Sequence, residues 1–379
     1  MSLKLIIVLL IPLVLIAAWV AGARRMQTRL EPHLIQVVPG TVELKPLGDG
    51  SFAAQADERV VGYARVDQAN GYGGPMRIAV GIDTTGTIAG VTIVDHKETE
   101  AYFRKVLSGN GPGSFVGRHV SDPIEPGVDV DAVTGATQSN LALVTGVRQG
   151  ARTLGTNQLG FDVPAADPVR FRFGWAEIVL LMLFVTGFAG TYTQVPGKKP
   201  LRWISQIAAL VLIGFVYAIP ITLTHINSLL VGYLPDWRTQ FYWYLLIIGV
   251  LLPVLLTGKR PYCGYVCPFG AVQDCLGAVG GRRKKIPEVI QRWLGWFHAV
   301  LVFAAIFVAL YTRNPGLTSY EVQGSLFDLT GLLYQFVVLG VVLVLSLFIA
   351  RPWCRFLCPI NGVTRYIKTA RSSWRNRAK

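Results

Sequence analysis

The chain has 379 residues, 52% of them hydrophobic, and a formal net charge of +14 at pH 7. With a mean hydropathy of +0.44, this apolar share excludes an ordinary soluble protein. The charge does not indicate nucleic-acid binding, because residues 24–172 hold 15 basic and 16 acidic residues and the basic surplus lies elsewhere.

Six apolar stretches predict transmembrane helices, since about 20 such residues cross a bilayer. Several begin with Trp or a Tyr/Trp cluster, as membrane-interface anchors do. We interpret the first as an uncleaved anchor and not a signal peptide, because Arg24 and Arg25 stand where a cleavage region should be uncharged. The stretches are residues 3–23, 175–192, 203–223, 241–257, 293–311 and 332–350.

Basic residues are distributed unevenly among the loops between these stretches. Eighteen lie around the second and fourth loops or behind the last stretch, whereas the short third and fifth loops hold only Arg238 and Arg313. The positive-inside rule then predicts that both termini are cytoplasmic and that residues 24–172 are outside. We therefore expect a multi-pass protein of the bacterial inner (cytoplasmic) membrane, with some contact to anionic lipid.

Residues 24–172 have the length of one periplasmic or extracytoplasmic domain with its own core. The segments "RVVGYARV", "MRIAVGI" and "IAGVTIVDH", separated by Gly-rich turns, predict a β meander. A helix over about residues 100–107 follows. The periodicity of Leu141, Val144, Val147, Ala151 and Leu154 then predicts an amphipathic helix.

The fold class is thus an α+β extracytoplasmic domain fused to an all-α membrane domain. The expected domains are a transmembrane anchor (1–23), the extracytoplasmic domain (24–172) and a five-helix membrane domain (173–379).

The stretch "DAVTGATQSN", residues 131–140, lies on a loop that feeds the amphipathic helix. A helix N-terminus offers free backbone N–H groups to a phosphate, and small residues let a ligand approach closely. From the residues alone, the stretch is either a phosphate site or a Thr N-cap.

Two segments of the membrane half repeat one another. "RPYCGYVCPFGAV", from Arg260, aligns with "RPWCRFLCPINGV", from Arg351, and each follows an even-numbered stretch. We expect an internal two-helix repeat whose halves are related by an axis along the membrane normal.

The repeat holds two cysteine pairs, Cys263 with Cys267 and Cys354 with Cys358. On the cytoplasmic side disulfides are disfavoured, so we expect thiols or metal ligands. Four thiolates brought together by the repeat form the ligand set of an iron–sulfur cluster, and a structural zinc stays an alternative. Cys275 lies outside the repeat, and we interpret it as structural.

"DAVTGAT" resembles the Asp-x-x-Ser/Thr-Gly-Ala-Thr/Ser motif of FMN-binding domains in the Na⁺-pumping quinone reductase, in Rnf complexes and in NosR-type membrane proteins. The resemblance implies that a flavin transferase esterifies FMN to Thr137. Glu98 and Thr99 match a Glu-Thr pair placed near the flavin, although "EAYFRKV" replaces the usual Pro-Gly-Leu-Gly continuation. The other matching motif residues are Asp131, Thr134, Gly135 and Ala136.

The two CxxxCP segments resemble those in the membrane halves of NosR, NirI and PceC-type proteins. The chain ends some twenty residues after Cys358, without the C-terminal ferredoxin-like module of NosR. The short PceC-type architecture is therefore the nearer match.

Together these features predict a transmembrane electron-transfer flavoprotein. Electrons would pass between a cytoplasmic-side metal centre on the four cysteines and the FMN on Thr137, and then to an exported acceptor protein. Quinol or a cytoplasmic ferredoxin-like protein is the expected donor, which would make the chain a candidate quinol dehydrogenase component. A bilayer core of about 30 Å is too thick for one hop, so a deeper metal centre, a quinone, a second flavin or another subunit must bridge it.

Two alternatives belong to other classes. One is a redox-sensing regulatory or maturation factor for an exported metalloenzyme. The other is a zinc-stabilised membrane scaffold with a flavin domain.

Overall fold

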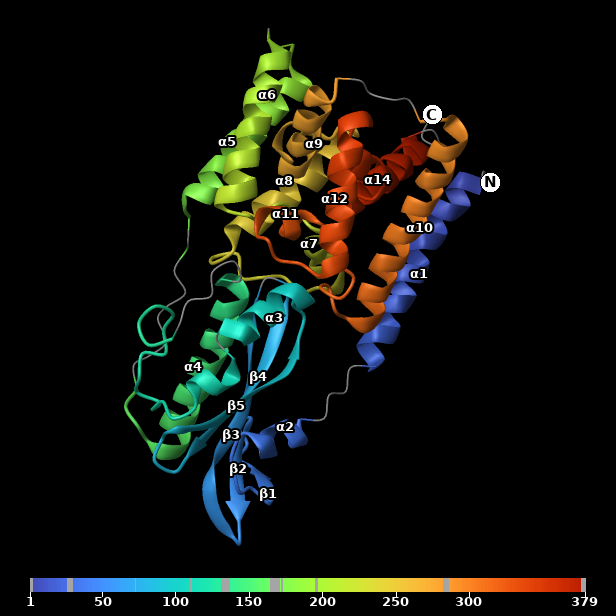
Figure 1. Ribbon diagram of the computed structural model, residues 1–379. Coiled ribbons are helices and arrows are strands. Elements are labelled where there is room, and N and C mark those ends of the chain that lie inside the picture. Colours follow the sequence, from blue (N-terminus) through green and yellow to red (C-terminus); the bar gives the residue numbers. More distant parts are fainter. Residues whose placement is uncertain are drawn as a thin grey trace. The chain divides into compact units, whose positions relative to one another are not determined.

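The computed structural model describes residues 3–25, 30–71, 73–109, 111–130, 137–163, 171, 173–194, 197–281 and 286–375. The chain forms two compact units (Figure 1). The sheet unit comprises Ala23–Pro168 and Asn314–Leu317, and the helical unit comprises Met1–Gly22, Val169–Arg313 and Thr318–Lys379.

The sheet unit is built on five antiparallel strands that follow one another in chain order. The register pairs Val66 with Ala79 and Val80 with Val91 in the central strands. The last three strands confirm the predicted meander, and the first two were not predicted. The strands are β1 (Glu43–Pro46), β2 (Ser51–Ala56), β3 (Arg59–Asn70), β4 (Pro75–Asp83) and β5 (Ile88–His96).

Helix α4 (Thr137–Leu159) covers one face of this sheet. Alternate residues of β4 point to it, because side chains of a strand alternate between its two faces. Gly146 permits the close approach: a Cβ built there would lie 2.4 Å from Cδ1 of Ile78. The core of this face is formed by Ile78, Val80 and Ile82 of the sheet with Leu143, Val144, Val147, Ala151 and Leu154 of α4. Leu143 thus takes the core position predicted for Leu141, which is only half-buried.

The opposite face of the sheet packs on α2 (Glu31–Gln36) and the residues just behind it. Leu34 and Val38 are almost completely buried against Ala64 and Ala79, which point away from α4. Burying each such side chain stabilises the fold by about 2 kcal/mol. Beyond β5, α3 (Glu100–Gly109) confirms the predicted helix, and η1 (Pro112–Phe115) packs Phe115 into the core.

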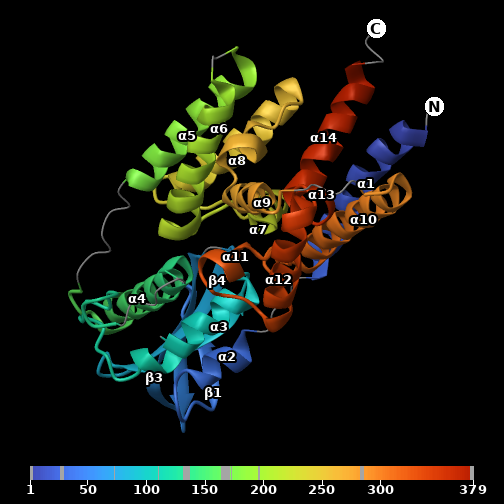
Figure 2. The same ribbon diagram turned by 45° about the horizontal axis from the view of Figure 1, so that its top comes forward.

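The helical unit places a helix in each of the six apolar stretches (Figure 2). The long elements are α1 (Leu3–Arg25), α5 (Trp175–Tyr192), α6 (Lys198–Ala209) continued by the π-helical η2 (Leu210–Val216), α8 (Phe241–Thr257), α10 (Glu288–Thr312) and α12 (Leu333–Phe348). The others are α7 (Leu223–Val231), η3 (Tyr262–Val266), α9 (Pro268–Val279), α11 (Gln323–Phe327), α13 (Pro352–Phe356) and α14 (Pro359–Arg375).

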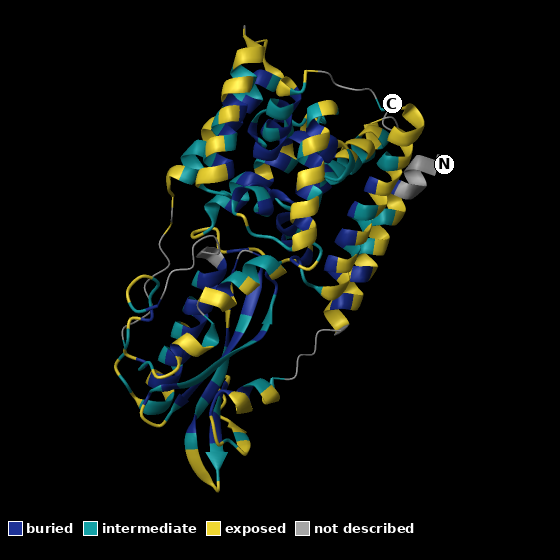
Figure 3. Cartoon of the chain, viewed as in Figure 1, coloured by how far each residue is buried: buried dark blue, intermediate teal, exposed yellow. Residues whose placement is uncertain are grey.

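Three helices in the described part are long and apolar enough to cross a membrane: Trp175–Tyr192, Lys198–Val216 and Glu288–Thr312. In the other three stretches, the described residues give shorter apolar segments, Val8–Arg24, Phe241–Thr257 and Leu333–Phe348, so the six-span topology stays a prediction. Large apolar side chains such as Met182, Val185 and Ile204 are exposed. Figure 3 shows exposed positions along the outer faces of the helices. Exposed apolar surface of this kind suits contact with lipid.

The third apolar stretch departs from its predicted bounds, residues 203–223. The helix ends at Val216, and Ala218 takes a left-handed conformation with φ +53°. Pro220 follows, and a proline disfavours helical conformation in the residue before it. The chain restarts as α7 only at Leu223, behind the capping residue Thr222.

Candidate functional site

The two cysteine segments have matching local structures. Each begins with a short helical turn, η3 or α13, which carries the first cysteine. Each ends at a proline, Pro268 or Pro359, that opens the next helix directly after the second cysteine. Proline suits this first helical position because it lacks an N–H that would have no partner there. A new helix therefore begins directly after each second cysteine.

The first segment folds back into the helical unit. Tyr265 lies against α5 at two glycines: a Cβ built on Gly190 would lie 2.4 Å from the Tyr265 ring, and one on Gly187 would lie 3.4 Å from its Cβ. Tyr262 and Val266 belong to the same apolar core as Leu180 of α5. Cys263 and Cys267 therefore lie on a segment that packs beside the last turns of α5.

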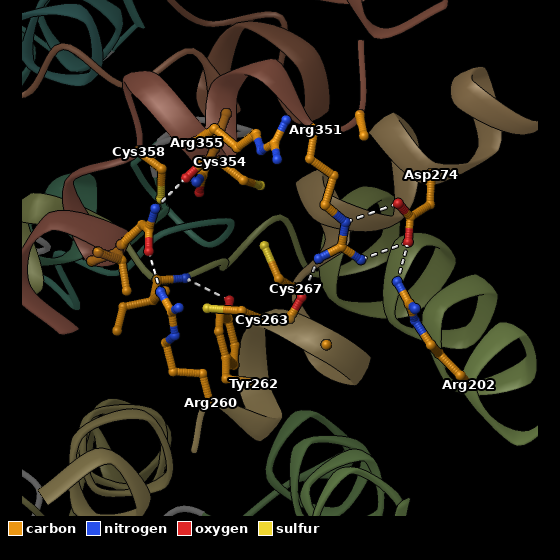
Figure 4. Close-up of a pocket in the computed structure, with 16 residues that line it drawn as sticks. Arg202, Arg260, Tyr262, Cys263, Cys267, Asp274, Arg351, Cys354, Arg355 and Cys358 are labelled. Atoms are coloured by element: carbon orange, nitrogen blue, oxygen red, sulfur yellow. Dashed lines mark hydrogen bonds and ion pairs between the residues drawn. The ribbon is translucent and has the colours of Figure 1, made fainter. Parts of the chain in front are cut away.

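Cys263, Cys267, Cys354 and Cys358 line one cavity of about 440 Å³. Figure 4 shows them around this cavity, together with arginines from three parts of the chain. Cys275 is not among the lining residues. Two segments about 90 positions apart in the sequence thus present four thiols to one space, as the repeat predicted.

An arginine of the second segment holds the first segment in place. Arg351 donates to the backbone oxygen of Cys263 at 2.6 Å and to both carboxylate oxygens of Asp274 at 2.8 and 2.6 Å (Figure 4). Asp274 also accepts from Arg202 at 2.5 Å and from Gln206 at 3.0 Å. A carboxylate with several charge-assisted donors fixes their geometry strongly.

In turn, Arg260 of the first segment holds the second segment in place. Arg260 donates to the side-chain oxygen of Asn361, and the Asn361 amide donates to the backbone oxygen of Cys354 at 2.5 Å. Asn361 corresponds in the repeat to Gly270. A Cβ built on Gly270 would lie 3.6 Å from Nη1 of Arg351, an ordinary contact distance, so the Arg351 guanidinium passes close to this position. Each half of the site is therefore held by the other.

Further donors fix the second cysteine pair. Gln273 donates to Sγ of Cys354 at 3.2 Å, and its oxygen accepts from the backbone N–H of Trp353 at 3.0 Å. A ring nitrogen of His298 lies 2.8 Å from the backbone oxygen of Cys358. Hydrogen bonds of this outer shell orient metal ligands and tune the bound centre. None of these partners was predicted, although the arginines stand at matching positions of the repeat.

The donor set fits a cluster better than a single ion. A zinc ion with four thiolates at about 2.3 Å would draw the sulfurs to within about 3.8 Å of one another. Among the described residues, no group of three or more His, Cys, Asp or Glu side chains is arranged to hold one metal ion. Four thiols around a cavity of about 440 Å³ suit a larger inorganic centre.

We expect the Arg351 clamp to contribute to stability. Arg351→Gln would leave the nearly buried Asp274 carboxylate with fewer donors, at a cost of about 3 kcal/mol. The measurement is thermal unfolding of the full-length protein in detergent, together with the rate at which a chelator removes iron. Arg375→Gln, a matched change at an exposed position, should alter neither. An unchanged Arg351→Gln protein would contradict the clamp.

In the sheet unit, Glu98 links three segments. It is 2% exposed, and its carboxylate accepts from the backbone N–H of Gly73 at 3.1 Å and from Oγ of Ser139 at 2.5 Å. A Cβ built on Gly71 would lie 2.0 Å from its Oε1. The glycine turn after β3, the end of β5 and the first turn of α4 therefore meet at one buried carboxylate.

The resemblance also pointed to Thr99 and Thr137. The backbone oxygen of Thr99 accepts from Tyr102 and Phe103 at 3.0 Å and starts α3. Thr137 is the first residue of α4, two positions before Ser139, so Glu98 lies near the predicted attachment point. A helix N-terminus beside a turn that only glycine fits suits a phosphate group. The side chain of Thr137 and the residues Asp131, Thr134, Gly135 and Ala136 lie outside the described part.

His96, two residues before Glu98, stacks on Phe103 with ring centroids 3.5 Å apart. Burial lowers the pKa of His96, so the ring is neutral at pH 7. Its Nδ1 is buried and has no hydrogen-bond partner among the described residues. His96 is thus the last residue of β5 and lies two positions before Glu98.

Two known domain families match the parts of the chain that contain these two sites. The FMN-binding domain family matches residues 71–152, which include Glu98, Thr99 and Thr137. The 4Fe-4S binding domain family matches residues 239–287 and 332–377, which include the four cysteines of the cavity. The chain combines an FMN-binding domain with a 4Fe-4S binding domain. This match favours iron–sulfur chemistry over the zinc alternative.

Several characterised proteins are similar to parts of this FMN-binding and 4Fe-4S chain. Protein NirI of Paracoccus denitrificans is 27% identical over 49% of the chain and 30% of its own length. Regulatory protein NosR of Stutzerimonas stutzeri is 24% identical over 51% of the chain and 29% of its own length. A component of the Na⁺-translocating ferredoxin:NAD⁺ oxidoreductase complex of Acetobacterium woodii is 28% identical over 25% of the chain and 50% of its own length. The chain thus matches about a third of the length of NirI and NosR, and it is an electron-transport-type protein related to them and to components of Rnf complexes.

Proposed function

We propose that this protein carries electrons across the cytoplasmic membrane, from quinol to a flavin on the outer side and then to an exported acceptor protein. Cys263, Cys267, Cys354 and Cys358 would hold a 4Fe-4S cluster on the cytoplasmic side, and Thr137 would hold FMN through a phosphoester. The proposed topology has both termini in the cytoplasm and residues 24–172 outside.

One observation carries the proposal: two distant segments of a membrane-type helical unit line a single cavity with four thiols. A bound 4Fe-4S cluster supplies single-electron transfer, and FMN accepts one or two electrons. The first segment packs beside the final turns of α5, so the proposed topology would put the cysteines at the end of a membrane helix and not in a free loop. Such a placement would shorten the remaining gap to the outer side.

A second cavity supports quinol as the donor. It measures about 500 Å³ and is mostly apolar, with residues from α1, α7, α8, α10 and α14 in its wall. His298 lies in that wall and contacts the backbone oxygen of Cys358 at 2.8 Å. An apolar cavity with a few polar groups at one side suits a lipid-soluble, ring-bearing ligand. The other polar residues of the wall are Arg365, Tyr366 and Thr369.

The donor step can be tested on the purified, cofactor-loaded protein. Under anaerobic conditions a short-chain menaquinol should bleach the FMN absorbance. Ala299→Trp, which fills the cavity, should slow this reduction about tenfold or more, since lost binding of about 1.4 kcal/mol is a factor of ten. Leu181→Trp on an exposed face of α5 should not. Dithionite should reduce both variants normally. Failure of quinol to reduce the flavin of the unmodified protein would overturn the quinol assignment.

A regulatory or maturation role is the second candidate, because the similar NosR is named a regulatory protein. The two functions differ in what the cysteines do for an exported acceptor. If the protein is an electron carrier, Cys354→Ala stops electron delivery to an acceptor that is already mature. If it is a maturation factor, the same variant leaves a mature acceptor active and reduces only the yield of new acceptor.

A further inference from the structure

A basic cavity adjoins the cysteine cavity in the helical unit. It measures about 390 Å³, and its wall comes from α10, α13, α14 and the segment before η3. Four of its residues are cationic, and no acidic residue lines it within the described part of the chain. The cationic residues are Arg260, Arg355, Arg365 and Lys368, and the neutral ones include Gln291, Asn361 and Thr369.

These four cations differ from the other arginines of the site. Arg202 and Arg351 are paired with Asp274, whereas none of the four forms an ion pair with another described residue. The partner of Arg260 in Figure 4 is a neutral amide oxygen, that of Asn361. Like charges around one cavity repel one another, and a bound anion removes that cost.

We infer that this cavity binds a phosphate-bearing anion. Guanidinium groups match phosphate oxygens with paired N–H donors, and Lys368 adds a point charge. The same chemistry belongs to an anionic phospholipid headgroup and to a soluble phosphate or pyrophosphate. The wall helix α14 favours access from the membrane surface, because it is amphipathic and basic and exposes Trp374.

The anion and the proposed cluster are coupled. Arg260, Arg355 and Asn361 line both cavities, so an anion in one partly neutralises the charge that faces the other. Reduction adds negative charge at the cysteines, so the anion binds the oxidised state more tightly and lowers the reduction potential. A tenfold preference for the oxidised state corresponds to a shift of about −59 mV for a one-electron couple. This coupling rests on the proposed cluster, whereas anion binding does not.

Binding is tested first, by calorimetry with pyrophosphate on the full-length protein in phosphatidylcholine nanodiscs. We expect saturable binding that Lys368→Gln weakens about tenfold, because the variant removes a charge-assisted hydrogen bond to the anion. Arg365→Gln with Lys368→Gln should abolish it. Arg371→Gln with Arg375→Gln, the same charge change on the same helix outside the cavity, should not. Equal loss in both double variants would overturn the site.

Native mass spectrometry then separates the two sources. If a lipid headgroup is the ligand, protein from phosphatidylglycerol or cardiolipin membranes retains phospholipid, and the Arg365/Lys368 double variant does not. If a soluble anion is the ligand, no lipid is retained and pyrophosphate still binds in phosphatidylglycerol nanodiscs. If the protein neither retained phospholipid nor bound pyrophosphate, the inference would be overturned.

The coupling is read from redox titration of the cluster by electron paramagnetic resonance. The occupied site should lower the midpoint potential of the unmodified protein, and the Arg365/Lys368 double variant should show no response. If the midpoint potential did not change although the anion was shown to be bound, the coupling would be refuted and anion binding would not. A protein without any iron would instead refute the proposed function and leave the binding result standing.

Discussion

Cys354→Ala should yield a protein that has lost its iron and acid-labile sulfide. Cys354 lines the cavity with three other thiols, and its Sγ accepts from Gln273. Loss of an outer-shell partner alone costs about 10–100-fold in metal affinity, so loss of a ligand should cost at least as much. Iron and sulfide analysis of anaerobically purified protein, with the visible absorbance near the flavin bands, measures the effect.

The matched control for this change is Cys275→Ala. Cys275 lies on α9, close in sequence to the first pair, but does not line the cavity. Its replacement should leave iron, sulfide and absorbance unchanged. If Cys354→Ala retained a full complement of iron and sulfide, or if Cys275→Ala lost it, the assignment of the four ligands would be wrong.

Thr137→Ala should eliminate the covalent flavin. The FMN-binding domain match includes this residue, and α4 begins at it, beside the buried Glu98 carboxylate. In a host that supplies a flavin transferase, the protein without the substitution should carry one FMN-phosphoryl adduct. The adduct should lie on the peptide that contains residue 137. The variant lacks the hydroxyl that would form the phosphoester, so the adduct should fall to the detection limit of mass spectrometry.

Thr153→Ala provides the comparison, because Thr153 is a threonine of the same helix whose hydroxyl donates to the backbone oxygen of Gln149 on the exposed side. It should carry a full adduct, and Thr137→Ser should restore at least part of it. An adduct that persists in Thr137→Ala would show that another hydroxyl is the attachment point.

Much of the fold was predictable because its signals are local. Alternation of apolar residues predicted β3, β4 and β5, and apolar runs predicted α5 and α8 with their observed bounds. Strands β1 and β2 were missed, since they are short and their apolar residues do not alternate cleanly. The third apolar stretch was predicted to be too long, because composition alone does not reveal that Ala218, two residues before Pro220, takes a left-handed conformation.

The site was predictable to the extent that it depends on the repeat. The matching segments predicted that the cysteines would meet, and they line one cavity. The contacts of Arg351, Asp274 and Asn361 depend on side chains that come together only in three dimensions. The repeat nevertheless contained a signal, because both arginines occupy the position before the first proline. Most of the flavin motif lies outside the described residues, so FMN attachment at Thr137 stays a prediction.

The reciprocal clamps constrain the order in which the protein is made. Arg351 reaches the backbone of Cys263, and Arg260 reaches Asn361, so neither half of the cysteine site is complete until the other has been synthesised. Asn361 follows Arg260 by 101 positions, so the ribosome adds it only after the helices between them have been made. Assembly of an iron–sulfur centre must therefore wait for the second segment, and a nascent chain arrested before residue 361 should acquire neither iron nor sulfide.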